Sequence, residues 1–231
     1  MLFRSEGIPV AIQYVDIKQE ILSENDQLAN ELRTRLKQHK TFMINVMSSP
    51  GAGKTTLLLD TIRRLRDELR IGVVEADIES MVDAEKIEET GALAVQIRTG
   101  GDCHIDAPML KPALDAIDLD AVDLLFLENV GNLVCPAEFD TGTSCNIMLL
   151  SVPEGDDKVL KYPLMFTVCD LLLVTKLDCQ PLFDFDLEKL KMRVRQLNPN
   201  MKILPVCCKT GENMEAWVDW LLSAYRSFVS D

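Results

Sequence analysis

The sequence lacks long apolar segments, and none approaches the roughly 20 residues that a helix needs to cross a bilayer. Residues 1–13 lack the long apolar core of a signal peptide. There is no internal repeat and no low-complexity tract. We therefore expect a soluble, cytoplasmic protein with no membrane partner.

Positive charge is also scarce, since 24 lysines and arginines face 37 acids and the net charge is −13. An acidic surface repels phosphate backbones, so we expect no nucleic-acid partner. The 231 residues are 47% hydrophobic and 26% charged, which suits one well-buried α/β domain with at most a small appendage. Seven cysteines without a secretory signal predict reduced thiols that serve as core residues or metal ligands.

Apolar runs alternate with helical patterns along the chain. The runs occupy residues 42–47, 71–76, 93–97, 123–128, 146–152, 170–174 and 202–206. Helical spacing of apolar residues occurs at 15–40, after the first run (Leu58, Ile62, Leu65 and Leu69), at 186–197 and at 212–228. Continuous apolar runs suit strands that are covered on both faces. The alternation therefore predicts an α/β fold with a doubly wound, mainly parallel sheet and helices on both faces.

A glycine-rich turn follows the first predicted strand and precedes an amphipathic helix. It fits the Walker pattern of P-loop NTPases, except that Ser48 stands at the leading glycine position. Glycines let backbone N–H groups turn toward phosphates, Lys54 reaches the β- and γ-oxygens, and the Thr55 hydroxyl ligates magnesium. The residues expected to bind a nucleoside triphosphate here are Pro50, Gly51, Ala52, Gly53, Lys54, Thr55 and Thr56.

Acids end two of the predicted strands. Asp77 ends the second, where its carboxylate can join the magnesium shell directly or through water. Glu128 ends the fourth and precedes Gly131, which matches the Walker B acid and the glycine that senses the γ-phosphate. We expect Thr55, Asp77 and Glu128 to hold magnesium, and Lys54, Asp77 and Glu128 to form the catalytic set.

Thr175-Lys176-Leu177-Asp178 follows the sixth predicted strand and is similar to the guanine-reading Asn-Lys-x-Asp motif of GTPases. The Asp178 carboxylate suits the N1–H and amine of guanine, a donor pair that adenine lacks. Threonine for asparagine at Thr175 costs about 1 kcal/mol if one hydrogen bond is lost. The stretch from Cys207 to Gly211 matches the last base-contacting loop. We expect GTP and GDP rather than ATP, contacted also by Gly131, Thr175, Lys176, Asp178, Cys208 and Lys209.

Thiols and an imidazole form a second group of candidates. His104 directly follows Cys103, and Cys135 lies four positions beyond Gly131. Thiolate and imidazole together suit zinc, nickel or copper rather than magnesium. Spacing alone leaves open whether these three bind a metal or are core cysteines beside a loop histidine. The residues expected to have other roles are Cys145, Cys169, Cys207 and Cys208 in the core and His39 on the surface, while Cys179 has no assigned role.

Several longer motifs resemble one family in the same order along nearly the whole chain. They are Glu75 to Asp77, Thr99 to Ala107, Glu128 to Pro136, Glu154 to Lys158, Lys161 to Pro163, and Phe183 to Asp186. These motifs are similar to those of the hydrogenase nickel-incorporation GTPases, the HypB family. The roles of Lys158 and Lys161 within them are not assigned by the sequence.

The resemblance implies a GTPase in which Cys103, His104 and Cys135 bind nickel or zinc near a subunit interface. It also implies a homodimer linked to nucleotide and metal, and cooperation with other hydrogenase maturation proteins. Hydrolysis would be slow, since no arginine finger is evident. Residues 1–40 would be a helical extension packed on a P-loop GTPase domain of residues 41–231.

Two other functions stay open at this point. A urease-type maturation GTPase would share the P-loop, but the Cys-Pro-His motif of that type is absent. A regulatory GTPase would use its cysteines only structurally. Because Cys135 lies so close to Gly131, we also expect GTP and metal occupancy to be coupled through the segment from Glu128 to Cys135.

Overall fold

The computed structural model describes residues 17–77 and 82–230, with side chains described for 22–76 and 84–230. Seven strands form one sheet in the order β3-β2-β4-β1-β5-β6-β7. Every neighbouring pair is parallel. The strands are β1 Phe42–Ser48, β2 Ile71–Asp77, β3 Leu93–Arg98, β4 Leu124–Glu128, β5 Cys145–Ser151, β6 Leu171–Thr175 and β7 Lys202–Pro205. The predicted doubly wound sheet is confirmed, and it is entirely parallel.

Burial explains why the strands could be located from apolar runs. Every residue of the central strands β1, β4 and β6 is buried, whereas the edge strands β3 and β7 are partly exposed. Pro205 ends β7, an edge position where a missing N–H breaks no ladder. Each strand begins and ends within one residue of its predicted range.

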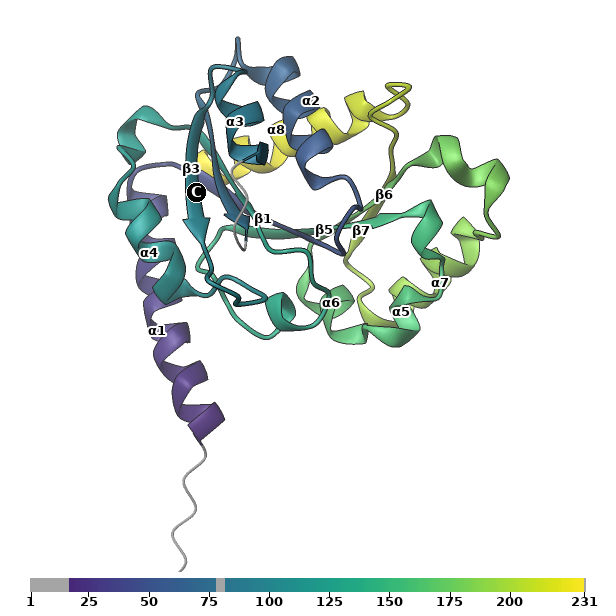
Figure 1. Ribbon diagram of the computed structural model, residues 1–231, viewed down its shortest axis with the longest axis horizontal. Coiled ribbons are helices and arrows are strands. Elements are labelled where there is room, and N and C mark those ends of the chain that lie inside the picture. Colours follow the sequence, from purple (N-terminus) through teal and green to yellow (C-terminus); the bar gives the residue numbers. More distant parts are fainter. Residues whose placement is uncertain (1–16, 78–81, 231) are drawn as a thin grey trace, which may run out of the picture.

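The helices cover both faces of the sheet (Figure 1). Helices α2, α3 and α8 lie on one face, and α1, α4, α5, α6 and α7 lie on the other. Their bounds are α1 Ile17–Gln38, α2 Lys54–Leu65, α3 Val82–Glu88, α4 Ala107–Asp115, α5 Lys158–Lys161, α6 Pro163–Val168, α7 Leu187–Leu197 and α8 Met214–Ser230. Short 3-10 helices occur at η1 Leu119–Ala121, η2 Cys135–Ala137, η3 Val152–Glu154 and η4 Leu177–Leu182.

On the face of the sheet covered by α2 and α8, the core includes the large aromatic side chain of Trp217. Trp217 of α8 is fully buried, and its indole N–H donates to the Thr61 hydroxyl of α2 at 2.8 Å. Leu58, Ile62 and Leu65 of α2 are buried as their spacing predicted. Leu69 lies beyond the end of α2 and is only half-buried, because the helix stops at Leu65.

Helix α1 lies against α4 on the opposite face (Figure 1). Leu32 and Leu36 bury their side chains in the same cluster as the apolar residues of α4. The Arg33 guanidinium binds both carboxylate oxygens of Asp140, at 2.7 and 2.6 Å. Residues 15 and 16 of the predicted helix lie outside the described residues. Within the described part of the chain, no helix combines the length and apolarity needed to span a membrane.

Candidate nucleotide and metal sites

A large cavity lies at the carboxyl edge of the sheet, where parallel α/β sheets bind their ligands. Its volume is about 560 Å³, and ligand clefts measure about 300–1,000 Å³. The glycine-rich turn, the end of β2, helix α3 and the segment after β4 form its walls. The predicted residues that line it are Pro50, Gly51, Gly53, Lys54, Thr55, Thr56, Glu128, Gly131 and Lys176.

The glycine-rich turn has the backbone that phosphate binding requires. Gly51 and Gly53 have φ angles of 75° and 108°, in the region that favours glycine. Helix α2 begins directly after Gly53, so its N-terminal N–H groups and dipole face the cavity. Lys54 is 9% exposed, and its ammonium donates to the Ser48 hydroxyl at 3.2 Å. Ser48, at the leading glycine position, therefore contacts the lysine that is predicted to bind phosphates.

The structure describes the side chains of two of the three predicted magnesium ligands, Thr55 and Glu128. The Thr55 hydroxyl donates to the Glu128 carboxylate at 2.9 Å, so these two side chains meet in the cavity. Both supply the hard oxygen atoms that magnesium prefers. Asp77 ends β2 as predicted, but its side chain lies outside the described residues. Glu75, which pairs in register with Glu128, also lines the cavity and was not assigned a role from the sequence.

A second cavity of about 240 Å³ adjoins the first and shares Gly53, Thr56 and Lys176 with it. Its other walls are Ala52, Thr175, Asp178, Cys179, Cys207, Cys208 and Lys209. The predicted base-reading residues therefore come together from two loops, after β6 and after β7. The two cavities share part of their walls and hold the residues predicted for the phosphates and for the base.

The loop after β6 is fastened to the phosphate-binding turn. The Thr175 hydroxyl is buried and donates to the Ala52 carbonyl at 2.7 Å. The Lys176 ammonium donates to the Gly51 carbonyl at 2.6 Å. Lys176 has a φ of 59°, an uncommon angle for a side-chain-bearing residue. Thr175 thus ties the base loop to the phosphate loop, which the sequence did not predict.

Asp178 is held as an ionised carboxylate facing the base cavity. Lys209 donates to one of its oxygens at 3.1 Å, and the Cys207 thiol donates to the other at 3.4 Å. These hydrogen bonds, led by that of Lys209, lower the pKa of Asp178 below its usual value. Cys207 was expected only as a core residue; it is buried, but its thiol also contacts Asp178.

Gly131 packs against the phosphate-binding turn more closely than any other residue type could. A Cβ atom at this position would lie 2.9 Å from the N, Cα and Cγ atoms of Pro50. Such distances are below van der Waals contact, so a side chain would force the backbone apart. The turn after β4 therefore touches the P-loop directly, in the place expected of a residue that senses the γ-phosphate.

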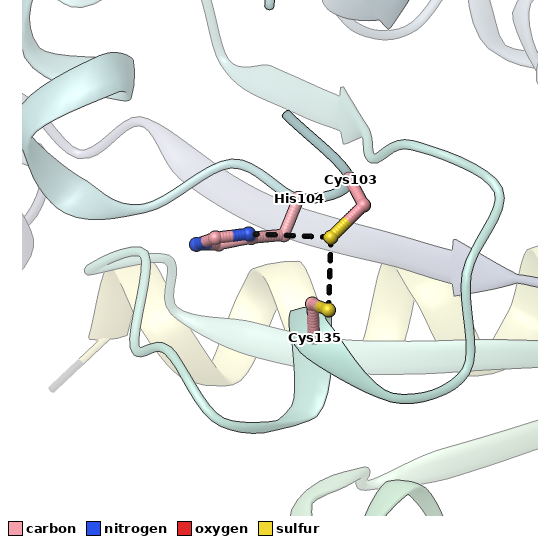
Figure 2. A group of neighbouring side chains, drawn as sticks. All are labelled: Cys103, His104 and Cys135. Carbon is pink, nitrogen blue, oxygen red and sulfur yellow. Dashed lines mark hydrogen bonds between the residues drawn. The ribbon is translucent and has the colours of Figure 1, made fainter. Parts of the chain in front are cut away.

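Cys103, His104 and Cys135 come together from two loops, as Figure 2 shows. The two sulfur atoms lie 2.9 Å apart, and the Cys103 sulfur lies 4.0 Å from Nδ1 of His104. One ligand atom from each residue lies within 4.8 Å of the others. The His104 ring stacks on Phe139, with centroids 4.1 Å apart. These are the soft and borderline ligands that nickel and zinc prefer.

The cluster fits a single ion after a small adjustment. Thiolates bound to one tetrahedral zinc at ~2.3 Å lie ~3.8 Å apart, so the sulfur atoms need to separate by about 1 Å. The hydrogen bond with Cys135, together with burial, raises the pKa of the Cys103 thiol. A metal therefore has to displace a proton from this pair when it binds.

The remaining cysteines divide between the core and the base cavity. All seven thiols are free. Cys169 is buried in the core as expected, whereas Cys145 is half-buried at the start of β5. Burial raises the pKa of Cys208 to about 11, so its thiol is neutral at physiological pH. Cys179 and Cys208 both line the base cavity.

Several residues at the two sites were missed by sequence reasoning. Lys86 of α3 lines the phosphate cavity. Phe139 supports the imidazole, and Asn132 donates to the Cys103 carbonyl at 3.2 Å. Single aromatic, amide and lysine residues carry no spacing signal, and only the fold brings them to a site.

A model of the CobW/HypB/UreG nucleotide-binding domain family matches residues 42–205. The chain is 43% identical over 207 residues to hydrogenase maturation factor HypB of Escherichia coli strain K12, covering 90% of this chain and 71% of that protein. The chain belongs to the HypB family. It is also 40% identical over 216 residues to hydrogenase/urease maturation factor HypB of Helicobacter pylori, with 92% and 88% of the two chains covered.

Two solved HypB structures share the fold. HypB from Helicobacter pylori in complex with nickel superposes with a TM-score of 0.84 at 39% identity, covering 88% of this chain and 96% of that one. HypB from Archaeoglobus fulgidus gives a TM-score of 0.83 at 39% identity, covering 88% and 100%. The HypB resemblance and the P-loop NTPase fold predicted from the sequence are confirmed.

Proposed function

We propose that this chain is a GTP-hydrolysing metallochaperone that binds nickel or zinc and assists nickel insertion during [NiFe]-hydrogenase maturation. One observation carries the proposal: the cluster of Cys103, His104 and Cys135 is linked by a short segment to a turn that presses on the P-loop. Membership of the HypB family and the name of its E. coli relative, hydrogenase maturation factor, support the same function.

In this proposal the larger cavity holds the triphosphate and the smaller one holds guanine. The P-loop residues Pro50 to Thr56 bind phosphates, and Gly131 contacts the γ-phosphate. The lysine stem of Lys176 covers the base, while Asp178 accepts hydrogen bonds from it. Contacts from Thr175, Cys208 and Lys209 complete the base site, which their place around the smaller cavity supports.

Thr55, Glu128 and Asp77 would hold magnesium, which supplies charge neutralisation of the phosphates when bound. Lys54 would stabilise the charge that develops on the γ-phosphate. The contact between Thr55 and Glu128 supports the assignment of these two side chains. Among the described residues that line the phosphate cavity, the cations are lysines and no arginine is present, so we expect slow, switch-like hydrolysis to GDP and phosphate.

The cargo would bind through the two thiolates and the imidazole. Nickel and zinc both accept this ligand set, and the name of the H. pylori structure, HypB in complex with nickel, favours nickel. Three protein ligands leave coordination positions for water, a second subunit or a receiving protein. The exposure of Cys103 supports such a transfer, since the cargo has to leave.

The wider setting is also part of the proposal. The protein would act in the cytoplasm as a homodimer that depends on nucleotide and metal, together with other hydrogenase maturation proteins. Seven free thiols support a reducing compartment. Residues 1–40 would be a helical extension of the GTPase domain at 41–231; residues 1–16 lie outside the described residues, and the packing of α1 against α4 supports the proposal for the rest.

GTP and metal occupancy would be coupled through the segment from Glu128 to Cys135. Gly131 touches Pro50, and Cys135 lies four residues further on. A displacement of this turn on GTP binding or hydrolysis would therefore move a metal ligand. Equal nickel affinities with GDP and with a non-hydrolysable GTP analogue would contradict this coupling.

The deciding experiment is a nickel and zinc titration of the wild type against Cys103→Ala and Cys135→Ala, with Cys179→Ser as a matched control. Cys179 is a half-exposed thiol outside the cluster. We expect both alanine variants to lose high-affinity binding and the control to keep it. Unchanged binding in both alanine variants would leave a regulatory GTPase with structural cysteines as the function.

A second target enzyme is favoured by one comparison. The Helicobacter pylori relative is named a hydrogenase/urease maturation factor. The same metal site could therefore serve urease maturation in place of, or beside, hydrogenase maturation. Adding the nickel-loaded protein to apo-hydrogenase and to apo-urease and measuring the activity gained by each distinguishes the two targets.

A further inference from the structure

Asn129 is a fully buried amide that joins three functional segments. Its side-chain oxygen accepts hydrogen bonds from two backbone N–H groups, that of Val130 at 2.9 Å and that of Ile105 at 3.1 Å. Its side-chain nitrogen donates to Asn45 at 3.1 Å. Val130 precedes the γ-phosphate-sensing Gly131, and Ile105 follows His104. Asn45 lies on β1, the strand that leads into the P-loop.

These bonds restrict how the amide can respond to a movement. An amide oxygen has two lone pairs, and both are used here. The nitrogen is fastened to Asn45, whose own side chain donates to Asn146 on β5 at 3.2 Å. If the turn at Val130 moves, the Asn129 side-chain oxygen has two alternatives. It moves with the turn and weakens its hydrogen bond from the Ile105 N–H, or it stays and loses its hydrogen bond from the Val130 N–H. Leaving a buried N–H unpaired costs about 1–3 kcal/mol.

We propose that Asn129 is the positioning residue that transmits the position of the Gly131 turn to the Cys103-His104 loop. The inference rests on the proposed coupling of GTP and metal and gives it a second route. Continuity of the chain carries movement from Gly131 to Cys135, and Asn129 carries it across to the other two ligands. Both halves of the metal site then respond to the nucleotide.

The outer side of the same loop is fastened to a different element. Asn25 of α1 accepts a hydrogen bond from the Ala107 N–H at 3.0 Å and donates to the Asp140 carbonyl at 2.9 Å. Ala107 is three residues beyond His104, and Asp140 directly follows Phe139, which stacks on the His104 ring. Asn25 therefore supports the metal site without touching the turn at Gly131, which makes it the matched control.

The test measures nickel affinity in the presence of GDP and in the presence of a non-hydrolysable GTP analogue. The ratio of the two nickel affinities is compared between wild type, Asn129→Ala, Asn129→Asp and Asn25→Ala. We expect a wild-type ratio that differs from one by about 5- to 150-fold, the usual range of allosteric coupling. In Asn129→Ala only the route along the chain to Cys135 remains, so the ratio moves several-fold toward one. Asn129→Asp keeps the oxygen that accepts both N–H groups but loses the donor to Asn45, so it retains more of the ratio than Asn129→Ala does. Asn25→Ala weakens nickel binding equally in both nucleotide states.

The outcomes separate this inference from the proposed function. A wild-type ratio of one overturns both. A wild-type ratio far from one that survives unchanged in folded Asn129→Ala overturns only the role of Asn129. If Asn129→Ala does not fold, amide hydrogen exchange of the wild type decides. We expect the Ile105 and Val130 amides to change protection together between the two nucleotides, and a change at Val130 alone overturns the inference.

Discussion

At the scale of single residues, adding one methyl group at Gly131 is expected to disturb the contact with the P-loop. In Gly131→Ala the new methyl group would lie 2.9 Å from Pro50 backbone atoms, so the turn has to withdraw from the P-loop. We expect GTP hydrolysis to fall roughly 10- to 100-fold, since a misplacement of about 1 Å has effects of this size. Affinity for a non-hydrolysable GTP analogue should fall more than affinity for GDP, which lacks the γ-phosphate. Equal losses for both nucleotides, measured by titration, would contradict a γ-phosphate contact.

In the proposed base site, Asp178 would determine the base specificity. In Asp178→Asn an acceptor becomes an N–H donor, which mismatches the amine of guanine and matches the oxygen of xanthine. Hydrogen bonds to charged groups contribute about 1.5–3 kcal/mol, so GTP affinity should drop by roughly 10- to 150-fold while xanthosine triphosphate gains. Competition binding with the two nucleotides measures the exchange. Asp184→Asn, an exposed acid on the same loop and outside the base cavity, should change neither affinity.

At the scale of elements, the sequence predicts the strands and turns whose residue types are determined by burial or by backbone angles. The strands are apolar runs because both faces of the sheet are covered, so their positions could be predicted to within one residue. The glycine-rich turn was equally predictable, since its φ angles require glycine. The connection from Thr175 to Ala52 was not, because a threonine at a strand end has no periodic partner. It depends on two loops that only the sheet order brings together.

The contact between α2 and α8 gives a prediction about stability. Trp217→Phe removes the indole N–H that binds Thr61 and leaves part of a fully buried volume empty. We expect the free energy of unfolding to fall by about 1–3 kcal/mol, from the lost hydrogen bond and the cavity. Trp220→Phe is the matched control, because Trp220 is only half-buried on the same helix and should cost less. Urea denaturation of both variants measures the difference, and equal losses would contradict this account of the core.

At the scale of the whole molecule, the metal site illustrates the limit of sequence reasoning. Cys103 and Cys135 are 32 positions apart, and their spacing alone could not distinguish a metal site from core cysteines. The sheet brings the two thiols together, because the chains after β3 and β4 leave the same edge and place the two sulfur atoms 2.9 Å apart. Phe139, Asn129 and Asn25 then hold the loops by contacts that no linear motif records.

If GTP and metal occupancy are coupled as proposed, thermodynamic linkage requires the coupling to act in both directions. Nickel should change the ratio of the affinities for a GTP analogue and for GDP by the same factor by which the nucleotides change nickel affinity. Nucleotide titrations with and without saturating nickel measure this factor in the wild type, in Cys135→Ala and in Cys179→Ser. We expect the nickel effect to disappear in Cys135→Ala, which removes the ligand nearest the Gly131 turn in the sequence. It should persist in Cys179→Ser, whose thiol lines the base cavity and does not belong to the cluster. A nickel effect that survives in Cys135→Ala would mean that nucleotide and metal communicate by a route other than the segment from Glu128 to Cys135.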